Sequence, residues 1–419
     1  MRLQSLICTS RATRTPRGLE DSKGNVSSRV AILEAKRTPI GKFLGAFRNY
    51  SAVKLGADVA RAALASSGIA PQRVDEVWFG HARQAGNGPN PARQVSVRAG
   101  MPESVPAHTV NAACGSGLKS IALGADSIRL GRAGVVVAGG MENMSQVPFL
   151  LDRAREGYRL GHAPLVDDMY RDGFLCPLCD MVMGETAEVL AEEFEISREE
   201  QDTWAAMSQS RAERATRAGV FADEIVPITL EGARGDPQKI ERDEHPREGV
   251  TVASLAKLAP VFKKSGTVTA GNASGITDGA AAVVLASEEA ARASGRRPLA
   301  WIRDFIATGV EPRRMGIGPV PAVRTLLERN QLDLSRIDVI ELNEAFAAQV
   351  IACERELGFD RERVNPNGGS ISLGHPIGCS GTRVVVTLVH QMERTNAALG
   401  IATLCVSGGM GMAMLLERA

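Results

Sequence analysis

The sequence predicts an α/β protein made of two similar halves, with helices covering the faces of the sheets. Two pairs of similar segments, each pair separated by nearly the same number of residues, indicate a duplication. Within each half, amphipathic helical segments alternate with short apolar runs, an order typical of sheets packed between helices. A polar, loop-rich stretch separates the halves. We therefore expect two copies of one α/β unit, at about 29–150 and 297–419.

The duplication is visible in two pairs of segments. Val59–Gly80 aligns without a gap to Ala322–Asn343 at an offset of 263 residues. Val135–Met141 aligns to Leu404–Met410 at an offset of 269 residues. Chance could produce either echo alone, but two echoes in the same order favour a repeated unit.

Each expected element rests on a local pattern. Short apolar runs bounded by polar residues or glycine predict strands at 30–34, 77–79, 135–138, 282–286, 338–342 and 402–406. Apolar residues at helical spacing predict helices at 52–67, 115–130, 320–330, 344–357 and 381–393. The stretch between the halves should hold two helices. One of these begins at a capping box at 197–200 and ends near Gly219.

Charge and hydropathy exclude several kinds of partner. The 419 residues include 49 Lys and Arg against 48 Asp and Glu, for a formal net charge of +1. So neutral a chain has no basic footprint for nucleic acid or for an anionic membrane surface. No apolar run approaches the ~18 residues of a membrane span. We therefore expect neither nucleic acid nor a membrane span.

Seven cysteines, an odd number, are scattered along the chain, and no apolar leader precedes them. Free thiols in a reducing compartment are expected, which favours the cytoplasm. Residues 1–28 carry arginine, serine and threonine without hydrophobic periodicity, which predicts a disordered extension. A mitochondrial transit peptide, and with it the mitochondrial matrix, is the alternative, although Glu20 and Asp21 count against it.

The expected domains follow from these boundaries. They are an extension at 1–28, a first half at 29–150 that carries a reactive cysteine, a loop-rich insertion with the return to the first half at 151–296, and a second half at 297–419. An insertion between two similar halves is a natural place for substrate-binding loops.

Cys114 is the first candidate for chemistry. The segment 111–120 (NAACGSGLKS) reads as a strand end, a turn and a helix that begins just after the cysteine. A helix N-terminus favours a thiolate, and its free N–H groups can stabilise an oxyanion formed by attack on a carbonyl. A small buried thiol in a glycine turn is the structural alternative and has about equal weight on this motif alone.

Three further motifs follow in the second half. Glycines at 368, 369, 374, 378 and 381 bracket His375 on what should be a sharply turning loop. An apolar strand delivers Cys405 onto a glycine run, where a thiol could act as a base. Asn343 ends a strand in the segment 343–347 (NEAFA) and can orient a water or a carbonyl. Taken singly, a structural histidine and a buried strand cysteine would be the commoner explanations.

Other thiols carry weaker signals. Cys176 and Cys179 have the spacing of a redox or zinc pair, but no second close pair completes a metal site. Structural or incidental thiols are favoured there. Cys379 is similarly expected to be a packed small residue.

Together the four motifs resemble those of the thiolases, the CoA-dependent enzymes that make or cleave 3-ketoacyl-CoA. The resemblance covers about residues 29–419, and the duplication matches the doubled fold of that family, with its mixed sheets covered by helices. It implies reversible Claisen condensation of acetyl-CoA with acyl-CoA, or thiolysis of 3-ketoacyl-CoA, through a cysteine acyl-enzyme. The implied enzyme is an acetyl-CoA C-acyltransferase without metal or permanent cofactor, with CoA and acyl-CoA as substrates, assembled as a homodimer or homotetramer.

The resemblance also implies roles for individual residues. Cys114 would be the acylated nucleophile, His375 its activating base and Cys405 the acid/base for the second acyl-CoA, while Asn343 would hold a water beside His375. Substrate-binding positions would be Ser274, which matches a serine against the pantetheine of CoA, Met183, which matches a pocket methionine, Phe346 and Ser407.

Two positions depart from the family pattern. Ser407 replaces the first glycine of the usual run, and its N–H is retained for the acyl oxyanion unless that position needs a positive φ. Val182 stands where acetoacetyl-specific members often carry histidine, which leaves longer or branched acyl chains open.

Two other readings stay open. A decarboxylating ketoacyl synthase of the same fold would lack the second cysteine, so Cys405 disfavours it. A non-catalytic acyl-CoA or lipid carrier would be favoured by loss of Cys114, His375 or Cys405, and all three are present.

Overall fold

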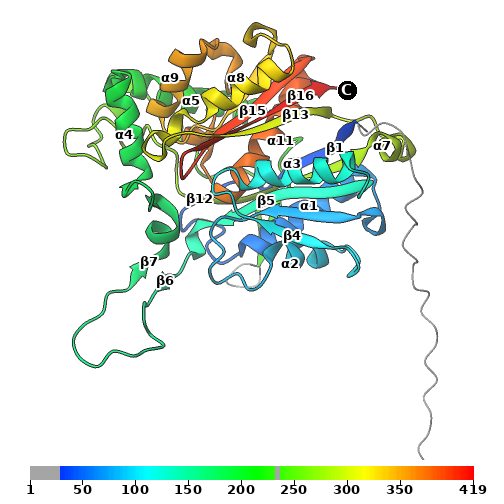
Figure 1. Cartoon of the computed structure of the whole chain (residues 1–419), viewed down its shortest axis with the longest axis horizontal. Coiled ribbons are helices and arrows are strands. Elements are labelled where there is room, and N and C mark those ends of the chain that lie inside the picture. The colour runs from blue at the N-terminus through cyan, green and yellow to red at the C-terminus, as the bar shows by residue number, and fades with distance from the viewer. Residues whose placement is uncertain (1–28, 232–235) are drawn as a thin grey trace, which may run out of the picture.

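The computed structural model describes residues 29–231 and 236–419, so the expected extension at 1–28 lies outside the described residues. The main strands form one hydrogen-bonded path in the order β14-β15-β16-β13-β1-β12-β5-β3-β4, with β2 paired to β12 (Figure 1). Their bounds are β1 (Val30–Arg37), β2 (Gly41–Lys42), β3 (Glu76–Gly80), β4 (Ala107–Val110), β5 (Val135–Asn143), β12 (Thr277–Ser287), β13 (Ala300–Gly309), β14 (Val339–Leu342), β15 (Leu399–Val406) and β16 (Met410–Arg418).

The strand pairing confirms the duplication. In the first half, β3 is parallel to β5, β5 is antiparallel to β12, and β12 is antiparallel to β1. In the second half, β14, β15, β16 and β13 repeat these relations in the same order. The halves meet where β1 and β13 pair over Val30–Ile32 and 300–302. Both strands break register just beyond that junction, between Ile32 and Glu34 and between Ile302 and Asp304.

An aspartate at equivalent positions of the two repeats makes the same hydrogen bonds in both halves. Asp75 accepts hydrogen bonds from the N–H groups of Gly134 and Val135, where β5 begins. Asp338 accepts from the N–H groups at 398 and 399, where β15 begins. A carboxylate that satisfies two otherwise unpaired donors fixes the start of the central strand, which explains why the residue recurs.

Helices cover the sheet in layers. The two central helices, α3 and α11, pack against each other between the strands of the two halves, and the others cover the outer faces (Figure 1). Their bounds are α1 (Ala52–Ser67), α2 (Pro91–Arg98), α3 (Ser116–Arg129), α7 (Glu288–Ser294), α8 (Pro319–Arg329), α9 (Ala347–Leu357), α10 (Ser370–Leu373) and α11 (Ile377–Thr395). The mixed sheet with helices on its faces is the predicted fold class.

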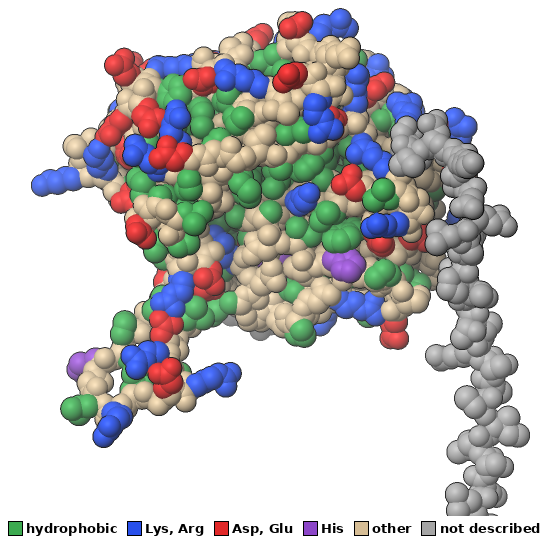
Figure 2. Space-filling model, in the orientation of Figure 1, with side chains coloured by type: hydrophobic (Ala, Val, Ile, Leu, Met, Phe, Trp, Pro, Cys, Tyr) green, Lys and Arg blue, Asp and Glu red, His purple; other side chains and the backbone are tan. Residues whose placement is uncertain are grey.

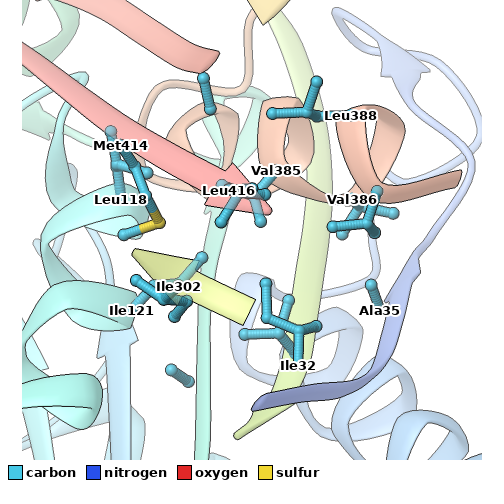
Figure 3. Packing of buried hydrophobic residues seen from close by; sticks show 14 of the residues in the cluster. Ile32, Ala35, Leu118, Ile121, Ile302, Val385, Val386, Leu388, Met414 and Leu416 are labelled. Carbon is cyan, nitrogen blue, oxygen red and sulfur yellow. The ribbon is translucent and has the colours of Figure 1, made fainter. Parts of the chain in front are cut away.

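The core between the halves is apolar and closely packed. Leu118 and Ile121 of α3 face Val385 of α11, and Ile32 of β1 and Ile302 of β13 close the cluster (Figure 3). Every residue of α11 from 377 to 392 is buried, so this helix is enclosed on all sides. Burying a leucine or isoleucine side chain is worth about 1.5–3 kcal/mol. The core therefore holds the two halves in one rigid arrangement.

Two predicted helices have different starts from those expected. The helix predicted from Glu344 begins at Ala347, because Phe346 bridges to Ala273 as an extended residue. The helix predicted from Gly381 begins at Ile377. A Cβ at Gly381 would lie 2.3 Å from the Leu118 backbone nitrogen, so this glycine permits close packing of α11 on α3 and is not a turn residue.

The insertion carries small hairpins and helices. They are β6 (Phe149–Leu150), β7 (Val166–Asp167), β8 (Leu175–Cys176), β9 (Met181–Val182), α4 (Met183–Glu193), α5 (Arg198–Arg217), β10 (Ile228–Glu231), β11 (Pro237–Ile240) and α6 (Val252–Leu255). The capping box at α5 is present as predicted, with Ser197 accepting from the Glu200 N–H and Glu200 from the Ser197 N–H. The β6–β7 arm projects from the body (Figures 1 and 2).

Several elements were not predicted from the sequence. The strands β4, β13 and β16 and the helix α2 lie in segments whose apolar residues gave no clear period. Two helices were expected between the halves, and the structure has α4 and α5 there, together with the short α6. None of the helices in the described ranges is long and apolar enough to cross a membrane.

Removing residues 1–28 is expected to leave turnover and melting temperature nearly unchanged. The first strand begins at Val30, and its pairing partners β12 and β13 both lie within the retained chain. Thermal denaturation and steady-state turnover of the truncated and full chains would measure this. A marked loss of folding would show that the extension packs onto the body.

Candidate active site

A cavity of about 500 Å³ opens where the two halves and the insertion meet. The sequence-predicted site residues that line it are Cys114, Met183, Ser274, Phe346, His375, Cys405 and Ser407. Asn343 is buried and does not line the cavity. Residues separated by up to about 290 positions in the chain are therefore gathered at one place, as the motifs predicted.

Cys114 lies on a tight turn just before α3. Ala113 has a φ of +46°, an unusual conformation for a residue with a Cβ. The turn is held by the Asn111 Oδ1, which accepts from the Ala113 N–H at 3.0 Å, and by Ser116 Oγ, which donates to the Ala113 carbonyl at 2.6 Å. Such strain persists only where the surroundings fix it, and here it presents the thiol to the cavity.

The resting state of Cys114 is the thiol. Burial raises its pKa above the ordinary value, although the Ser407 backbone N–H and the positive charge of Arg83 act in the opposite direction. A nucleophile in this state needs a base that removes its proton during the reaction. The Ser407 N–H is also placed to stabilise negative charge that develops beside the sulfur.

His375 follows Gly374, whose φ of +102° requires glycine at the turn. Its Nδ1 lies 2.6 Å from Ser380 Oγ, and that hydroxyl donates its single hydrogen to the Pro376 carbonyl at 3.0 Å. The Ser380 hydroxyl therefore accepts from Nδ1–H, and Nε2 carries the lone pair. Burial, with Arg383 and Arg83, lowers the pKa of His375 to about 3, so the ring is neutral and able to accept a proton.

Changing His375 to alanine is expected to slow acylation of Cys114 by about 10²–10⁴-fold, the usual effect of losing a general base. Rapid-quench measurement of the acyl-enzyme would give this rate. Ser380→Ala is the matched variant, because it leaves the ring and removes only the partner of Nδ1. We expect it to cost about threefold to tenfold, the value of one hydrogen bond. An unchanged rate in His375→Ala would contradict this role.

Cys405 is the penultimate residue of β15 and is buried against Phe346 and Met315. Burial raises its pKa well above the ordinary value, and the nearby Cys114 adds to this effect. The strand then turns through Gly408 and Gly409, both with positive φ, while Ser407 has no positive φ. The serine that replaces a glycine at 407 is therefore accommodated without backbone strain, and its N–H is retained.

Asn343 lies behind the cavity, in a network of buried polar groups. Its Oδ1 accepts from Ser370 Oγ at 2.6 Å, and Ser370 Oγ in turn accepts from Arg383 at 3.1 Å. Since arginine can only donate, the serine hydrogen must point to Asn343, which fixes the orientation of the amide. Within the described residues, its buried Nδ2 has no hydrogen-bond partner, and it is suited to hold a water.

Models of two thiolase domains match this chain. The N-terminal thiolase domain matches residues 30–289, and the C-terminal thiolase domain matches residues 296–418. The chain belongs to the thiolase family. The first model covers the turn that carries Cys114, and the second covers the loop of His375 and the strand that carries Cys405.

Individual relatives of the thiolase family are similar over nearly their whole length. An acetyl-CoA acetyltransferase of Pseudomonas aeruginosa is 52% identical over 389 residues, which are 93% of this chain and 99% of the relative. The crystal structure of Bacillus anthracis acetyl-CoA acetyltransferase has a TM-score of 0.92 and 46% identity, covering 94% of this chain and 99% of that one. Human mitochondrial 3-ketoacyl-CoA thiolase has a TM-score of 0.91 and 41% identity, with the same coverage.

Aromatic and cationic residues complete the cavity, and sequence reasoning missed them. Tyr170, Phe174 and Phe262 add aromatic surface, and Lys42 and Arg247 are exposed at the lining. Lys42 lies in β2, and the others belong to the insertion, where Tyr170 and Phe174 begin and end a short helical turn. No motif surrounds them, so only their position in the folded thiolase reveals them.

Glu344, the acidic residue of the 343–347 motif, has a structural task. Its buried carboxylate accepts from Trp204 Nε1 at 3.1 Å, Ser208 Oγ at 2.7 Å and Asn365 Nδ2 at 3.0 Å. These bonds tie α5 of the insertion to the strand end that carries Asn343. The motif thus combines one residue near the chemistry with one that holds the layers together.

The other four cysteines of the described ranges do not line the cavity. Cys379 is buried in the central core, and burial raises its pKa to about 12, which agrees with a packed small residue. Cys176 and Cys179 close the β8–β9 turn and lie within hydrogen-bonding reach of each other. Among the residues that the structure describes, no group of three or more histidine, cysteine or acidic side chains could hold a metal ion.

Proposed function

We propose that this thiolase-family chain is an acetyl-CoA C-acyltransferase that works through an acyl-enzyme on Cys114. It would cleave 3-ketoacyl-CoA with CoA, or condense acetyl-CoA with acyl-CoA in the reverse direction. The observation that carries the proposal is that two cysteines from different halves line one cavity together with a neutral, oriented histidine. Relatives named acetyl-CoA acetyltransferase support the same enzyme class.

In the thiolysis direction, His375 Nε2 takes the Cys114 proton as the sulfur attacks the 3-keto carbon. The carbon–carbon bond then breaks, and the acyl group stays on Cys114. Cys405, which is a thiol at rest because burial raises its pKa, gives its proton to the enolate carbon and releases acetyl-CoA. The Ser407 N–H supports the first oxyanion, and Asn343 with His375 supports the enolate oxygen through a water.

The second half-reaction restores the enzyme. The Cys405 thiolate takes the proton of incoming CoA, and the CoA sulfur attacks the acyl group. Cys114 leaves as a thiolate and recovers its proton from His375. Nucleophile and leaving group are both thiols of similar basicity, so the exchange needs no redox cofactor. Each proton that leaves a residue in the first half returns to it in the second.

The lining suggests how the substrate is held. Met183 and Phe346 supply apolar surface for the acyl chain, and Ser274 is proposed to lie against the pantetheine. Exposed Lys42 and Arg247 could meet the phosphates of CoA. Val182 gives room where a histidine would narrow the pocket, so we propose that acyl groups longer than acetyl are accepted.

We propose a homodimer or a homotetramer as the working assembly. The β6–β7 arm, which projects from the body in Figure 2, carries exposed Phe149, Leu160 and Leu165. Leu160 is 98% exposed. Apolar side chains on a projecting arm favour burial by another subunit. Strand β4, which ends the sheet, offers an edge for pairing with another subunit.

The cytoplasmic location stays a prediction. The six cysteines in the described part of the chain are free, as a reducing compartment requires.

The decisive test is to find the acyl group. The full chain is incubated with acetoacetyl-CoA and longer 3-ketoacyl-CoA esters, without added CoA, and examined by intact mass and peptide mapping. One acyl adduct on Cys114, with release of acetyl-CoA, is expected. An adduct on Cys405 or Cys379 would contradict the assignment. Binding without any adduct would favour a carrier, and activity that depends on a malonyl thioester would favour a decarboxylating synthase.

A further inference from the structure

We propose that Glu142 is a positioning residue that joins the loop of the nucleophile to the loop of the base. This inference rests on the roles given above to Cys114 and His375. Glu142 is the second-last residue of β5 and is completely buried, although it does not line the cavity. A buried carboxylate is costly unless its oxygens are well used, so its contacts should show what it does.

The carboxylate binds main-chain donors from both sides of the site. Its Oε2 accepts from the Gly378 N–H at 2.9 Å, in the first turn of α11 and three residues after His375. The same oxygen accepts from the Ala82 N–H at 3.2 Å, and Oε1 accepts from the Arg83 N–H at 3.1 Å. One side chain thus ties the base loop of the second half to the segment after β3 in the first half.

That segment leads directly to the nucleophile. The Ala82 carbonyl accepts from Asn111 Nδ2 at 3.2 Å, and Asn111 Oδ1 accepts from the Ala113 N–H at 3.0 Å. Ala113 is the strained residue immediately before Cys114. A continuous path of hydrogen bonds therefore runs from the His375 loop, through Glu142, to the turn that presents the thiol.

Glu142 acts as an anion. Burial alone would raise the pKa of this carboxyl, but His81, whose Nε2 lies 3.1 Å away, Arg83 and the Gly378 N–H together lower it. The charge acts on the reaction centre. It raises the pKa of Cys114 and of His375, whereas Arg83 lowers both. The other titratable groups around these two residues include Arg383 on α11 and five that line the same cavity, namely Lys42, Tyr170, His245, Arg247 and Cys405.

Glu142→Gln tests the link without changing side-chain size. One carboxylate oxygen becomes an NH₂ group. This group must face a main-chain N–H from which the oxygen had accepted a hydrogen bond. The two loops should then separate slightly. Because a displacement near 1 Å can cost about 10²-fold, we expect single-turnover acylation of Cys114 to slow by about 10²-fold. The KM for acyl-CoA should change by less than about threefold, since no cavity-lining residue is altered.

A second readout separates positioning from a merely structural role. Removing the negative charge should move the pH midpoint of Cys114 alkylation by iodoacetamide to lower pH, although acylation becomes slower. Loosened packing that hydrates the thiol would lower the midpoint as well, because burial raises the pKa of Cys114, so the shift is assigned to the lost charge only at an unchanged melting temperature. Asp75→Asn is the matched control, because Asp75 also accepts from two main-chain N–H groups, at the other end of β5 and away from the cavity. It should leave both measurements unchanged.

The outcomes are decisive in each case. Native acylation in a folded Glu142→Gln protein, or an unmoved alkylation midpoint, overturns the inference. If that protein does not fold, Asn111→Ala breaks the path at a surface residue. Acylation slowed by about tenfold at an unchanged melting temperature supports the link, and a native rate overturns it. Failure of the proposed function would look different, because the unmodified chain itself would then form no adduct on Cys114.

Discussion

Replacing Cys114 with alanine is expected to abolish the acyl-enzyme and to lower turnover by about 10⁴–10⁶-fold, the range seen when a covalent nucleophile is removed. The reason is that the cavity offers one thiol on a strained turn beside the Ser407 N–H, and the second thiol is buried at the end of β15. Thiolysis of acetoacetyl-CoA, with intact-mass detection of the acyl group, measures both effects.

Cys379→Ala is a suitable control for this experiment. It removes another buried thiol, and Cys379 does not line the cavity. Turnover within about threefold of the native value is expected, since the site residues are untouched. Alkylation offers an independent check on Cys114. Burial raises the pKa of its thiol, so the alkylation rate should still increase as the pH rises past the ordinary value of 9. Rapid turnover by Cys114→Ala would contradict its assignment.

Replacing Cys405 with serine is expected to separate the two halves of the reaction. The variant should be acylated on Cys114, because His375 activates that thiol independently. It should neither condense the acyl group nor exchange the α-hydrogens of acetyl-CoA at a useful rate, since a hydroxyl cannot replace the thiolate as a base. Deuterium incorporation into acetyl-CoA, measured beside adduct mass, gives the two activities separately.

The complementary variant completes the comparison. Cys114→Ser should be poor at acylation, because a hydroxyl is a weaker nucleophile and forms an oxygen ester that leaves less readily. It should retain part of the α-hydrogen exchange, which needs only the Cys405 base. Normal exchange by Cys405→Ser, or an inability of that variant to be acylated, would show that the division of roles is wrong.

The repeated unit and the residues that meet at the cavity could be predicted because each left a local signal. Asp75 and Asp338 recur at equivalent positions because both fix the start of a strand. His375 follows Gly374, whose φ of +102° requires glycine, and Cys114 stands beside Gly115 just before the helix α3. Such requirements act over a few residues, and they are readable in one sequence.

The supporting residues could not be predicted, because their reasons lie in distant segments. Glu142 looks like an ordinary acid at the end of a strand, and only folding brings Gly378 to it. The glycines at 378 and 381 were expected on a turning loop, but they lie within α11, where Gly381 allows the helix to approach α3 and Gly378 allows it to approach β5 and Ala82. Composition cannot distinguish a glycine that bends the chain from one that makes room for a neighbour.

The close approach of α3 and α11 has a consequence for how this enzyme can change over evolution. A Cβ at Gly117 would lie 2.7 Å from the Thr382 backbone nitrogen. The main chain of the two helices therefore sets their spacing, and a larger residue cannot replace this glycine without moving them apart. Near Tyr170 and Met183 the tight neighbours are side chains instead, since a Cβ at Gly173 would meet the Arg83 side chain and one at Gly184 would meet the Phe262 ring. Selection can therefore retune the accepted acyl group by editing one stretch of the gene while the reaction centre is inherited unaltered.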